Sequence, residues 1–393
     1  MNIPGKDRIV SLDIMRGIAI FGIFLVNMLD FHSPMLYLDP VSWWSDTVDV
    51  VTYNIIDILA QGSFYPLFSL LFGYGLVILR ERTISRGERF LPIALRRLFL
   101  LMVIGIVHAT LIWHGDILIN YALFGLLLLL FMRVSGTGMM ITGSLIWLIP
   151  NILLGMLFFI SIYMTQDIGV SIYEPSEAKQ SIEAYQNGSF LEITAQRIQD
   201  WYAVNNLANA IFMLFSIFPF FLLGAGAAKL KLVERVKDFK RSFAITFTIF
   251  FTIGLLLKLS PYIIDRNLAF EYLQDSIGGP MLAIAYALGV ALLVENKLGN
   301  TGLAVFAPVG KMSMSNYLFQ SVVSTLIFYS YGLGFYNQIS AFFGTILVLV
   351  IYVIQIVLSS YWLKTHSYGP VEWVWRSVTY KKKQIWKHEG DKG

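Results

Sequence analysis

Apolar runs of membrane-spanning length recur along the whole of this 393-residue chain, and this recurrence constrains the fold more than any other feature. Hydrophobic residues make up 56% of the sequence and charged residues only 14%, whereas a soluble domain carries about 25% charged residues. The runs are solidly apolar and do not alternate, which argues against a β-barrel. The sequence therefore predicts an all-α, polytopic bundle of transmembrane helices.

The distribution of positive charge predicts how these spans are oriented. An arrangement of about ten spans places the basic segments 80–97, 229–241 and 381–383 on one side, as expected for the cytoplasmic face of a bacterial-type plasma membrane. We predict both termini in the cytoplasm, one transmembrane domain over residues 1–380 and a basic cytoplasmic tail over residues 381–393. The predicted spans cover residues 18–28, 64–79, 91–113, 117–132, 139–162, 207–228, 242–259, 280–294, 308–329 and 341–363.

Composition also excludes several classes of function. The chain has no cysteine, which rules out disulfides, thiol nucleophiles and thiolate metal sites. Its formal net charge of +4 is confined to short segments, which indicates membrane orientation and not nucleic-acid binding. No phosphate-binding loop, dinucleotide fingerprint or metal motif occurs. We expect neither a bound metal nor a nucleic-acid partner.

The third predicted span carries ionisable residues inside its apolar run. Arg97 and His108 are eleven residues apart, which puts both on one helical face, roughly 16 Å apart along the axis. Such groups usually face a cavity and are candidate functional residues. His32 and His114 are expected in the same outer half of the bundle, and each histidine has a structural alternative. Asp116 either orients an imidazole or caps the following helix.

The first predicted span repeats this pattern. Arg16 and Asn27 are also eleven residues apart, while Asp13 can pair with Arg16 as a surface ion pair. Two helices would then each carry an arginine near the cytoplasm and a polar group farther out. An arginine end can bind phosphate, so the pattern suits a slot for a long ligand with an anionic head.

The ninth predicted span carries a polar stripe at positions i, i+3, i+7 and i+11. The stripe consists of Ser313, Asn316, Gln320 and Ser324. Such a stripe either joins helices through hydrogen bonds or lines a cavity. Small residues between positions 62 and 75 indicate close helix contacts.

Five blocks of the sequence resemble the YeiB-like family, also called the domain-of-unknown-function 418 family. The first block is SLDIMRGIAI at residues 11–20 with Val26 and Asn27. The others are FSLLFG at 68–73, HGDIL at 114–118 with Tyr121 and Ala122, GKMS at 310–313 with Asn316, Tyr317, Gln320 and Ser321, and YGPVEWVWR at 368–376.

The resemblance implies an activity, because this family is grouped with transmembrane acyltransferases. These include heparan-α-glucosaminide N-acetyltransferase and sugar O-acyltransferases, which pass an acyl group from cytoplasmic coenzyme A to an acceptor across the membrane. The bacterial O-acyltransferases carry a basic residue, ten intervening residues and a histidine, which Arg97 and His108 match. The glucosaminide enzyme has its histidine after the first helix, which points instead to His32.

We therefore expect an integral-membrane acyltransferase that moves an acyl group from acyl-CoA to an acceptor hydroxyl or amine at the outer side. The acceptor is a glycan, a lipid or a small molecule, and membrane lipid is a partner. Transport of a small anionic or amphipathic molecule and a non-catalytic scaffold are the alternatives, and a homo-oligomer is left open. The expected catalytic residues are His108, His32, His114 and Asp116, and the expected donor-binding residues are Arg97, Arg16, Asn27, Ser313, Asn316 and Gln320.

Overall fold

The computed structural model describes residues 9–165, 174–295 and 302–387. Within these ranges the chain is helical and contains no β-strand, so the predicted all-α fold is confirmed. The elements are α1 (Val10–His32), η1 (Met35–Tyr37), α2 (Pro40–Trp43), α3 (Thr47–Leu59), α4 (Phe64–Ser85), α5 (Phe90–Leu111), α6 (Leu118–Leu130), α7 (Gly136–Thr165), α8 (Pro175–Asn187), α9 (Phe190–Asn205), α10 (Leu207–Ser216), α11 (Phe218–Lys229), α12 (Lys240–Ile263), α13 (Leu268–Leu273), η2 (Gln274–Gly278), α14 (Gly279–Glu295), η3 (Leu303–Phe306), α16 (Ala307–Lys311), α17 (Ser313–Phe328), α18 (Ala341–Thr365) and α19 (Pro370–Tyr380).

Eight segments of the described chain are long and apolar enough to cross a membrane. This confirms a polytopic membrane protein. Two further predicted spans correspond to α6, with 13 residues, and α17, with 16 residues. Both are shorter than the roughly 20 residues that a full crossing needs. The count of ten spans and the cytoplasmic position of both termini stay predictions, as does the division into a domain and a tail at residue 380.

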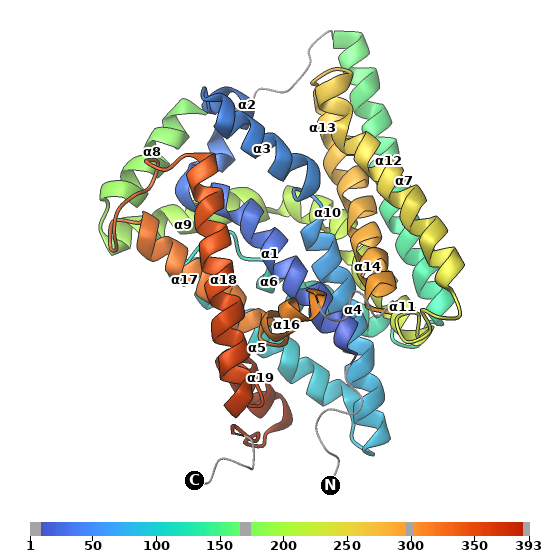
Figure 1. The fold of residues 1–393 in the computed structure, drawn as a ribbon. Coiled ribbons are helices and arrows are strands. Elements are labelled where there is room, and N and C mark those ends of the chain that lie inside the picture. The colour runs from blue at the N-terminus through green and yellow to red at the C-terminus, as the bar shows by residue number, and fades with distance from the viewer. Residues whose placement is uncertain (1–8, 166–173, 296–301, 388–393) are drawn as a thin grey trace.

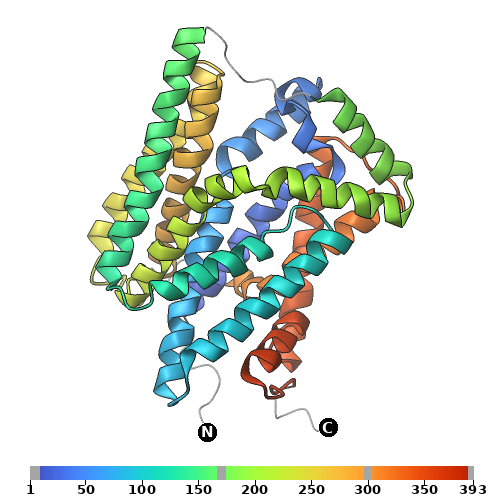
Figure 2. The same ribbon diagram turned by 180° about the vertical axis from the view of Figure 1, so that it is seen from behind.

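Helix α1 is the centre of the bundle. It contacts α4, α14, α16, α17 and α18. Figure 1 shows α7, α12, α13 and α14 grouped on one side of it and α17 and α18 on the other. Seen from behind, α9 and α10 lie across the long helices and not along them (Figure 2). Residues far apart in the sequence are thereby brought against the outer half of α1.

Close helix contacts depend on glycine. A Cβ atom on Gly73 of α4 would lie 2.1 Å from the carbonyl oxygen of Phe221, and one on Gly224 of α11 would lie 1.9 Å from that of Leu70. Both distances are far inside van der Waals contact, so the two backbones touch only because these side chains are absent. The close contact expected for the segment between positions 62 and 75 is confirmed at Gly73.

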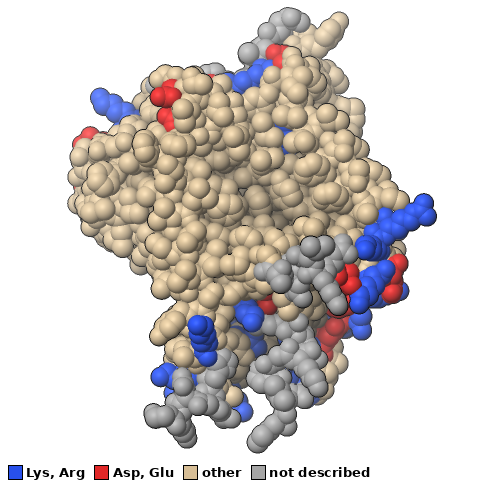
Figure 3. Space-filling view, in the orientation of Figure 1, with Lys and Arg blue, Asp and Glu red and all other residues tan. Residues whose placement is uncertain are grey.

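The middle of one face of the molecule carries few charged side chains (Figure 3). On the face shown in Figure 3, lysine and arginine gather mainly at the end where α4 and α19 finish, and most of the broad middle carries neither charge. Exposed members of this basic end include Arg82, Arg86, Arg89, Lys381 and Lys382. An uncharged belt with a basic end is the distribution expected of a membrane protein whose basic end faces the cytoplasm.

Candidate functional site

His108 lies in a hydrogen-bonded chain with an aspartate and a serine. Its Nδ1 atom is 2.9 Å from Asp116 Oδ1, and its Nε2 atom is 2.9 Å from Ser321 Oγ. With Asp116 ionised and His108 neutral, Nδ1 donates to the carboxylate and Nε2 accepts from the Ser321 hydroxyl, which also lies 3.4 Å from the carbonyl oxygen of Tyr317. We call Ser321, His108 and Asp116 the serine–histidine–aspartate chain. This order of groups can activate a serine for acyl transfer.

Three elements build this chain. His108 lies in the last turn of α5, Ser321 lies in α17, and Asp116 lies in the turn between α5 and α6. The other carboxylate oxygen of Asp116 accepts from the main-chain N–H of Ile119 at 2.9 Å. Asp116 therefore meets the imidazole with one oxygen and accepts from the first turn of α6 with the other, although the N-cap residue of that helix is Ile117 and not Asp116 as one interpretation predicted.

The chain is buried and surrounded by aromatic side chains. His108 is fully buried and Ser321 is 1% exposed. The ring of Tyr317 lies 5.2 Å from the imidazole and that of Trp113 lies 6.2 Å from it. The buried indole Nε1 of Trp113 has no hydrogen-bond partner among the described residues. A buried donor without a partner is costly in a fold, so Trp113 Nε1 is a candidate to donate to a reacting group.

His114 lies in a second polar cluster. Its Nε2 atom is 3.0 Å from Asp30 Oδ2, which is an ion-pair distance, but the angles are not those of a hydrogen bond. Its Nδ1 atom is 3.8 Å from Asp200 Oδ2. Tyr185 and Tyr37 each donate to Asp200 at 2.6 Å. Burial alone lowers the pKa of His114, but the carboxylates of Asp30 and Asp200 outweigh burial and raise this pKa above its ordinary value.

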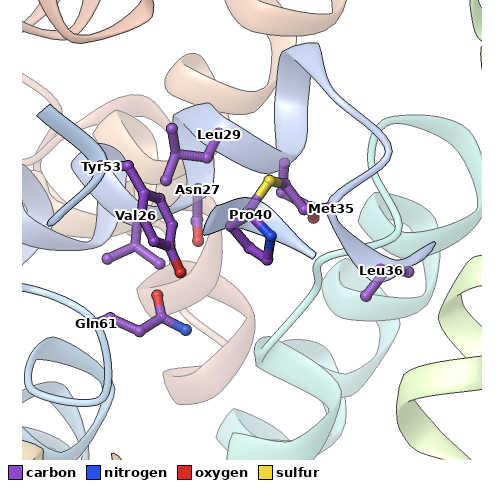
Figure 4. A pocket seen from close by; sticks show the side chains of 9 residues that line it. Val26, Asn27, Leu29, Met35, Leu36, Pro40, Tyr53 and Gln61 are labelled. Atoms are coloured by element: carbon purple, nitrogen blue, oxygen red, sulfur yellow. The ribbon is translucent and has the colours of Figure 1, made fainter. Parts of the chain in front are cut away.

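Asp30 joins this cluster to a cavity of about 320 Å³, which we call the outer pocket. Its polar lining residues are Asn27 and Asp30 of α1, Tyr53 of α3 and Gln61. The side chains of Asn27, Tyr53 and Gln61 turn their polar atoms toward a common space (Figure 4). Asn27 was expected to bind the donor, and the structure places it in this pocket.

His32 makes no hydrogen bond to the described residues of either cluster. It is fully buried, and its Nδ1 atom is 2.7 Å from Ser33 Oγ. Its Nε2 atom has no hydrogen-bond partner in the described part of the chain and faces Gly344 of α18, where a Cβ atom would lie 2.7 Å away. The structure thus places His32 in a tight contact between α1 and α18. Its catalytic role stays a prediction.

Arg97 and Arg16, expected to bind the anionic head of a ligand, lie close enough to repel each other electrostatically, and Arg376 of α19 repels Arg97 in the same way. Arg16 pairs with Asp13 at 3.2 Å. Across the described ranges neither Arg97 nor Arg376 has an acidic ion-pair partner. We call Arg16, Arg97 and Arg376 the arginine cluster. Neighbouring guanidinium groups with few carboxylates suit a phosphate-bearing ligand.

The polar stripe of α17 faces α18. Asn316 Nδ2 donates to Ser359 Oγ at 3.0 Å, and Gln320 Nε2 donates to Gln355 Oε1 at 2.8 Å. Gln355 in turn donates to the carbonyl of Asn316. These bonds join the two helices, which was one of the two interpretations of the stripe. A ligand role for Asn316 and Gln320 stays a prediction, as does one for Ser313, which is partly buried at the start of α17.

Sequence reasoning missed four residues of these sites: Ser321, Asp30, Asp200 and Arg376. Ser321 follows Gln320 directly and lies in one of the blocks quoted above, but it is off the stripe that drew attention to α17. Arg376 also lies in a quoted block, where Trp375 and Arg376 end the closing motif. Asp200 gave no usable signal, because it lies among many charged residues in a long polar segment.

Comparison with known proteins identifies the family. A family described as "Protein of unknown function (DUF418)" matches residues 227–382. The chain is 35% identical over 392 residues to "Uncharacterized protein YxaH" of Bacillus subtilis (strain 168), with 95% of each chain covered. It is 29% identical over 401 residues to "Uncharacterized protein YeiB" of Escherichia coli (strain K12), with 95% of this chain and 97% of that protein covered. The two relatives match nearly the whole chain, and the protein belongs to the YeiB-like DUF418 family.

Proposed function

We propose that this protein is a membrane acyltransferase whose reacting groups are Ser321, His108 and Asp116. The observation that carries the proposal is the pair of 2.9 Å contacts that link the serine hydroxyl, the imidazole and the carboxylate. All three groups are buried in a water-poor bundle, where such contacts are stronger than in water.

The proposed acyl transfer uses the neutral His108 tautomer in which Nδ1 carries the proton and Nε2 is free to act as a base. Ser321 Oγ forms a bond to the acyl carbonyl carbon while the carbon–sulfur bond of the thioester breaks. His108 Nε2 takes the serine proton and gives it to the leaving thiolate. In the second half, an acceptor hydroxyl or amine attacks the serine ester, and its proton passes through His108 back to Ser321 Oγ. Asp116 holds the imidazole in the required tautomer.

Acyl-CoA is the donor that best suits the rest of the chain. Its phosphates would bind at the arginine cluster, because Arg97 and Arg376 lack acidic partners among the described residues. The rise of α5 from Arg97 to His108 is roughly 16 Å, a distance that an extended pantetheine arm has to cover. Since acyl-CoA is cytoplasmic, we place the basic end at the cytoplasmic face of a bacterial plasma membrane and the acceptor toward the outer side.

Release of coenzyme A tests this proposal directly. The chain contains no cysteine, so a thiol reagent reports free coenzyme A without background from the protein. We expect purified protein with acetyl-CoA and a membrane extract as acceptor to release thiol, and Ser321→Ala and His108→Ala to reduce the rate to background. Asp116→Asn should lower it by about 10²- to 10⁴-fold, because it favours the wrong tautomer.

Ser324→Ala is the matched control. Ser324 lies one turn further along α17, is fully buried, and its hydroxyl has no hydrogen-bond partner among the described residues. This variant should retain the native rate. If Ser321→Ala and His108→Ala melt at the native temperature and still release thiol at the native rate, the proposal is wrong. Uptake of solute into vesicles without release of coenzyme A would favour the transport alternative.

A further inference from the structure

The outer pocket has the chemistry of a cation site. Its lining comes from α1, the segment around η1, α3 and the turn before α4, and it includes neither Ser321 nor His108. Among the described residues that line it, Asp30 is the only charged one. The other polar lining groups are two carboxamides and a phenol, all of which can accept a hydrogen bond. The remaining lining residues are Val26, Leu29, Met35, Leu36 and Pro40.

The carboxylate of Asp30 is accessible to a ligand. Its side chain is 21% exposed, whereas that of His114 behind it is 4% exposed. One oxygen faces His114 at 3.0 Å, and the described residues provide no hydrogen-bond partner for the other. Asn27 lies one turn earlier on α1, and both Asn27 and Asp30 line the pocket.

A tyrosine hydroxyl adds an acceptor to the pocket. The hydroxyl of Tyr53 points to the space between Asn27 and Gln61 in Figure 4, and its ring packs against Trp44 with centroids 5.5 Å apart. A pocket with one carboxylate, several acceptors and no basic lining residue favours a positively charged ligand over an anionic one.

We propose that the outer pocket binds a small organic molecule through an ammonium group held by Asp30. A volume of about 320 Å³ is at the lower end of ligand sites in general, which admits a small ligand and not a long chain. Asn27, Gln61 and Tyr53 accept the remaining ammonium hydrogens or bind a neighbouring hydroxyl group. This site is separate from the serine–histidine–aspartate chain, so the inference does not depend on acyl transfer.

The position of His114 couples this binding to pH. A protonated His114 and a bound ammonium compete for the same carboxylate. The groups around His114 are Asp30, Asp200, Arg197 and Tyr185, and those around Asp30 also include His32, Tyr329 and Tyr336. Loss of the His114 proton leaves Asp30 without a cation, so the ammonium binds more tightly as pH rises.

Thermal stabilisation by ethanolammonium chloride tests the proposal, with ethylene glycol and sodium chloride at equal ionic strength as neutral and salt controls. We expect a saturable rise in melting temperature with ethanolammonium alone. Asp30→Asn should weaken binding at least tenfold, since a hydrogen bond to a charged group accounts for about that factor. His114→Gln should bind ethanolammonium and lose the dependence on pH.

Asp265→Asn is the control carboxylate, because Asp265 lies in the α12–α13 connection and does not line the outer pocket. It should bind as the native protein does. Equal stabilisation by ethylene glycol, or native affinity in Asp30→Asn, would overturn the proposal. If Asp30→Asn does not fold, the proposal is tested by the affinity of Asn27→Ala for ethanolammonium and by the pH profile of His114→Gln. Both substitutions change the same site and leave the carboxylate in place.

Discussion

The guanidinium of Arg97 lies 3.6 Å from the centre of the Trp375 ring, and the Trp375 indole donates to the Arg97 carbonyl at 2.9 Å. The two residues are 278 positions apart in the chain. This double contact joins α19 to α5 and holds a cation in place by an aromatic face, which leaves its charge available to an anion. The closing block of the sequence therefore helps to build the arginine cluster of the proposed donor site.

Arg97→Gln should weaken binding of the acyl-CoA donor without abolishing acyl transfer. We expect the KM for acyl-CoA to rise by about tenfold or more, since a charged hydrogen bond to phosphate is lost, while kcat changes little. The KM of Arg97→Lys should lie between those of native protein and Arg97→Gln. Lysine keeps the positive charge but loses the two-pronged guanidinium and its stacking on Trp375. Steady-state kinetics with varied acyl-CoA measure this. An unchanged KM in Arg97→Gln would place the donor elsewhere.

Trp113→Phe separates activity from stability. The change removes a buried N–H that has no partner among the described residues, so the melting temperature should stay the same or rise. If that N–H donates to the oxygen of the reacting carbonyl, the rate should fall by about 10²-fold. Thiol release and thermal melting of the same preparation check both halves. A native rate in Trp113→Phe would remove Trp113 from the mechanism.

Glu372→Ala should destabilise the basic end of the bundle. Glu372 is buried in α19 and accepts from the main-chain N–H groups of Met314 and Ser315 at 2.8 and 3.0 Å and from the Ser315 hydroxyl at 2.5 Å. These bonds cap the first turn of α17. Leaving the donors unpaired should lower the free energy of unfolding by about 1–3 kcal/mol, seen as a lower melting temperature. Glu372→Gln, which keeps an acceptor, should lose less.

His114 makes stability depend on pH. Burial lowers the pKa of His114, but the carboxylates of Asp30 and Asp200 raise it by more. Its folded pKa is therefore above 6.5. The protonated imidazole therefore contributes stability that is fully present below pH 6.5 and is lost as pH rises through the folded pKa. The melting-temperature advantage of native protein over His114→Gln should be largest below pH 6.5 and shrink as pH rises through the folded pKa. A constant or growing advantage would contradict this.

The fold was predictable to the extent that local patterns determine it. Long apolar runs predicted most of the membrane helices, because length and composition decide whether a segment can cross a bilayer. Patterns of this kind do not report where a run stops being helical. Helix α6 ends two residues before the predicted span 117–132 does, and the predicted span 308–329 is interrupted at Met312 between α16 and α17.

The candidate site was predictable only in its local part. His108 and Asp116 are eight residues apart, and a turn between consecutive helices can bring them together. Ser321 is 213 residues from His108, and no periodicity in one helix reports a partner in another. For the same reason, the sequence did not indicate that Asp200 lies near His114 or that Arg376 lies near Arg97. The polar stripe drew attention to α17, yet its bonds to Gln355 and Ser359 depend on how α17 and α18 pack.

The most direct measurement is peptide mass spectrometry of native protein quenched after mixing with acetyl-CoA alone. An acetyl ester on Ser321, present in Ser324→Ala and missing in Ser321→Ala and His108→Ala, is the result that our account predicts. Turnover of acetyl-CoA by native protein with Ser321 never acetylated, and with full activity in Ser321→Ala, would contradict it.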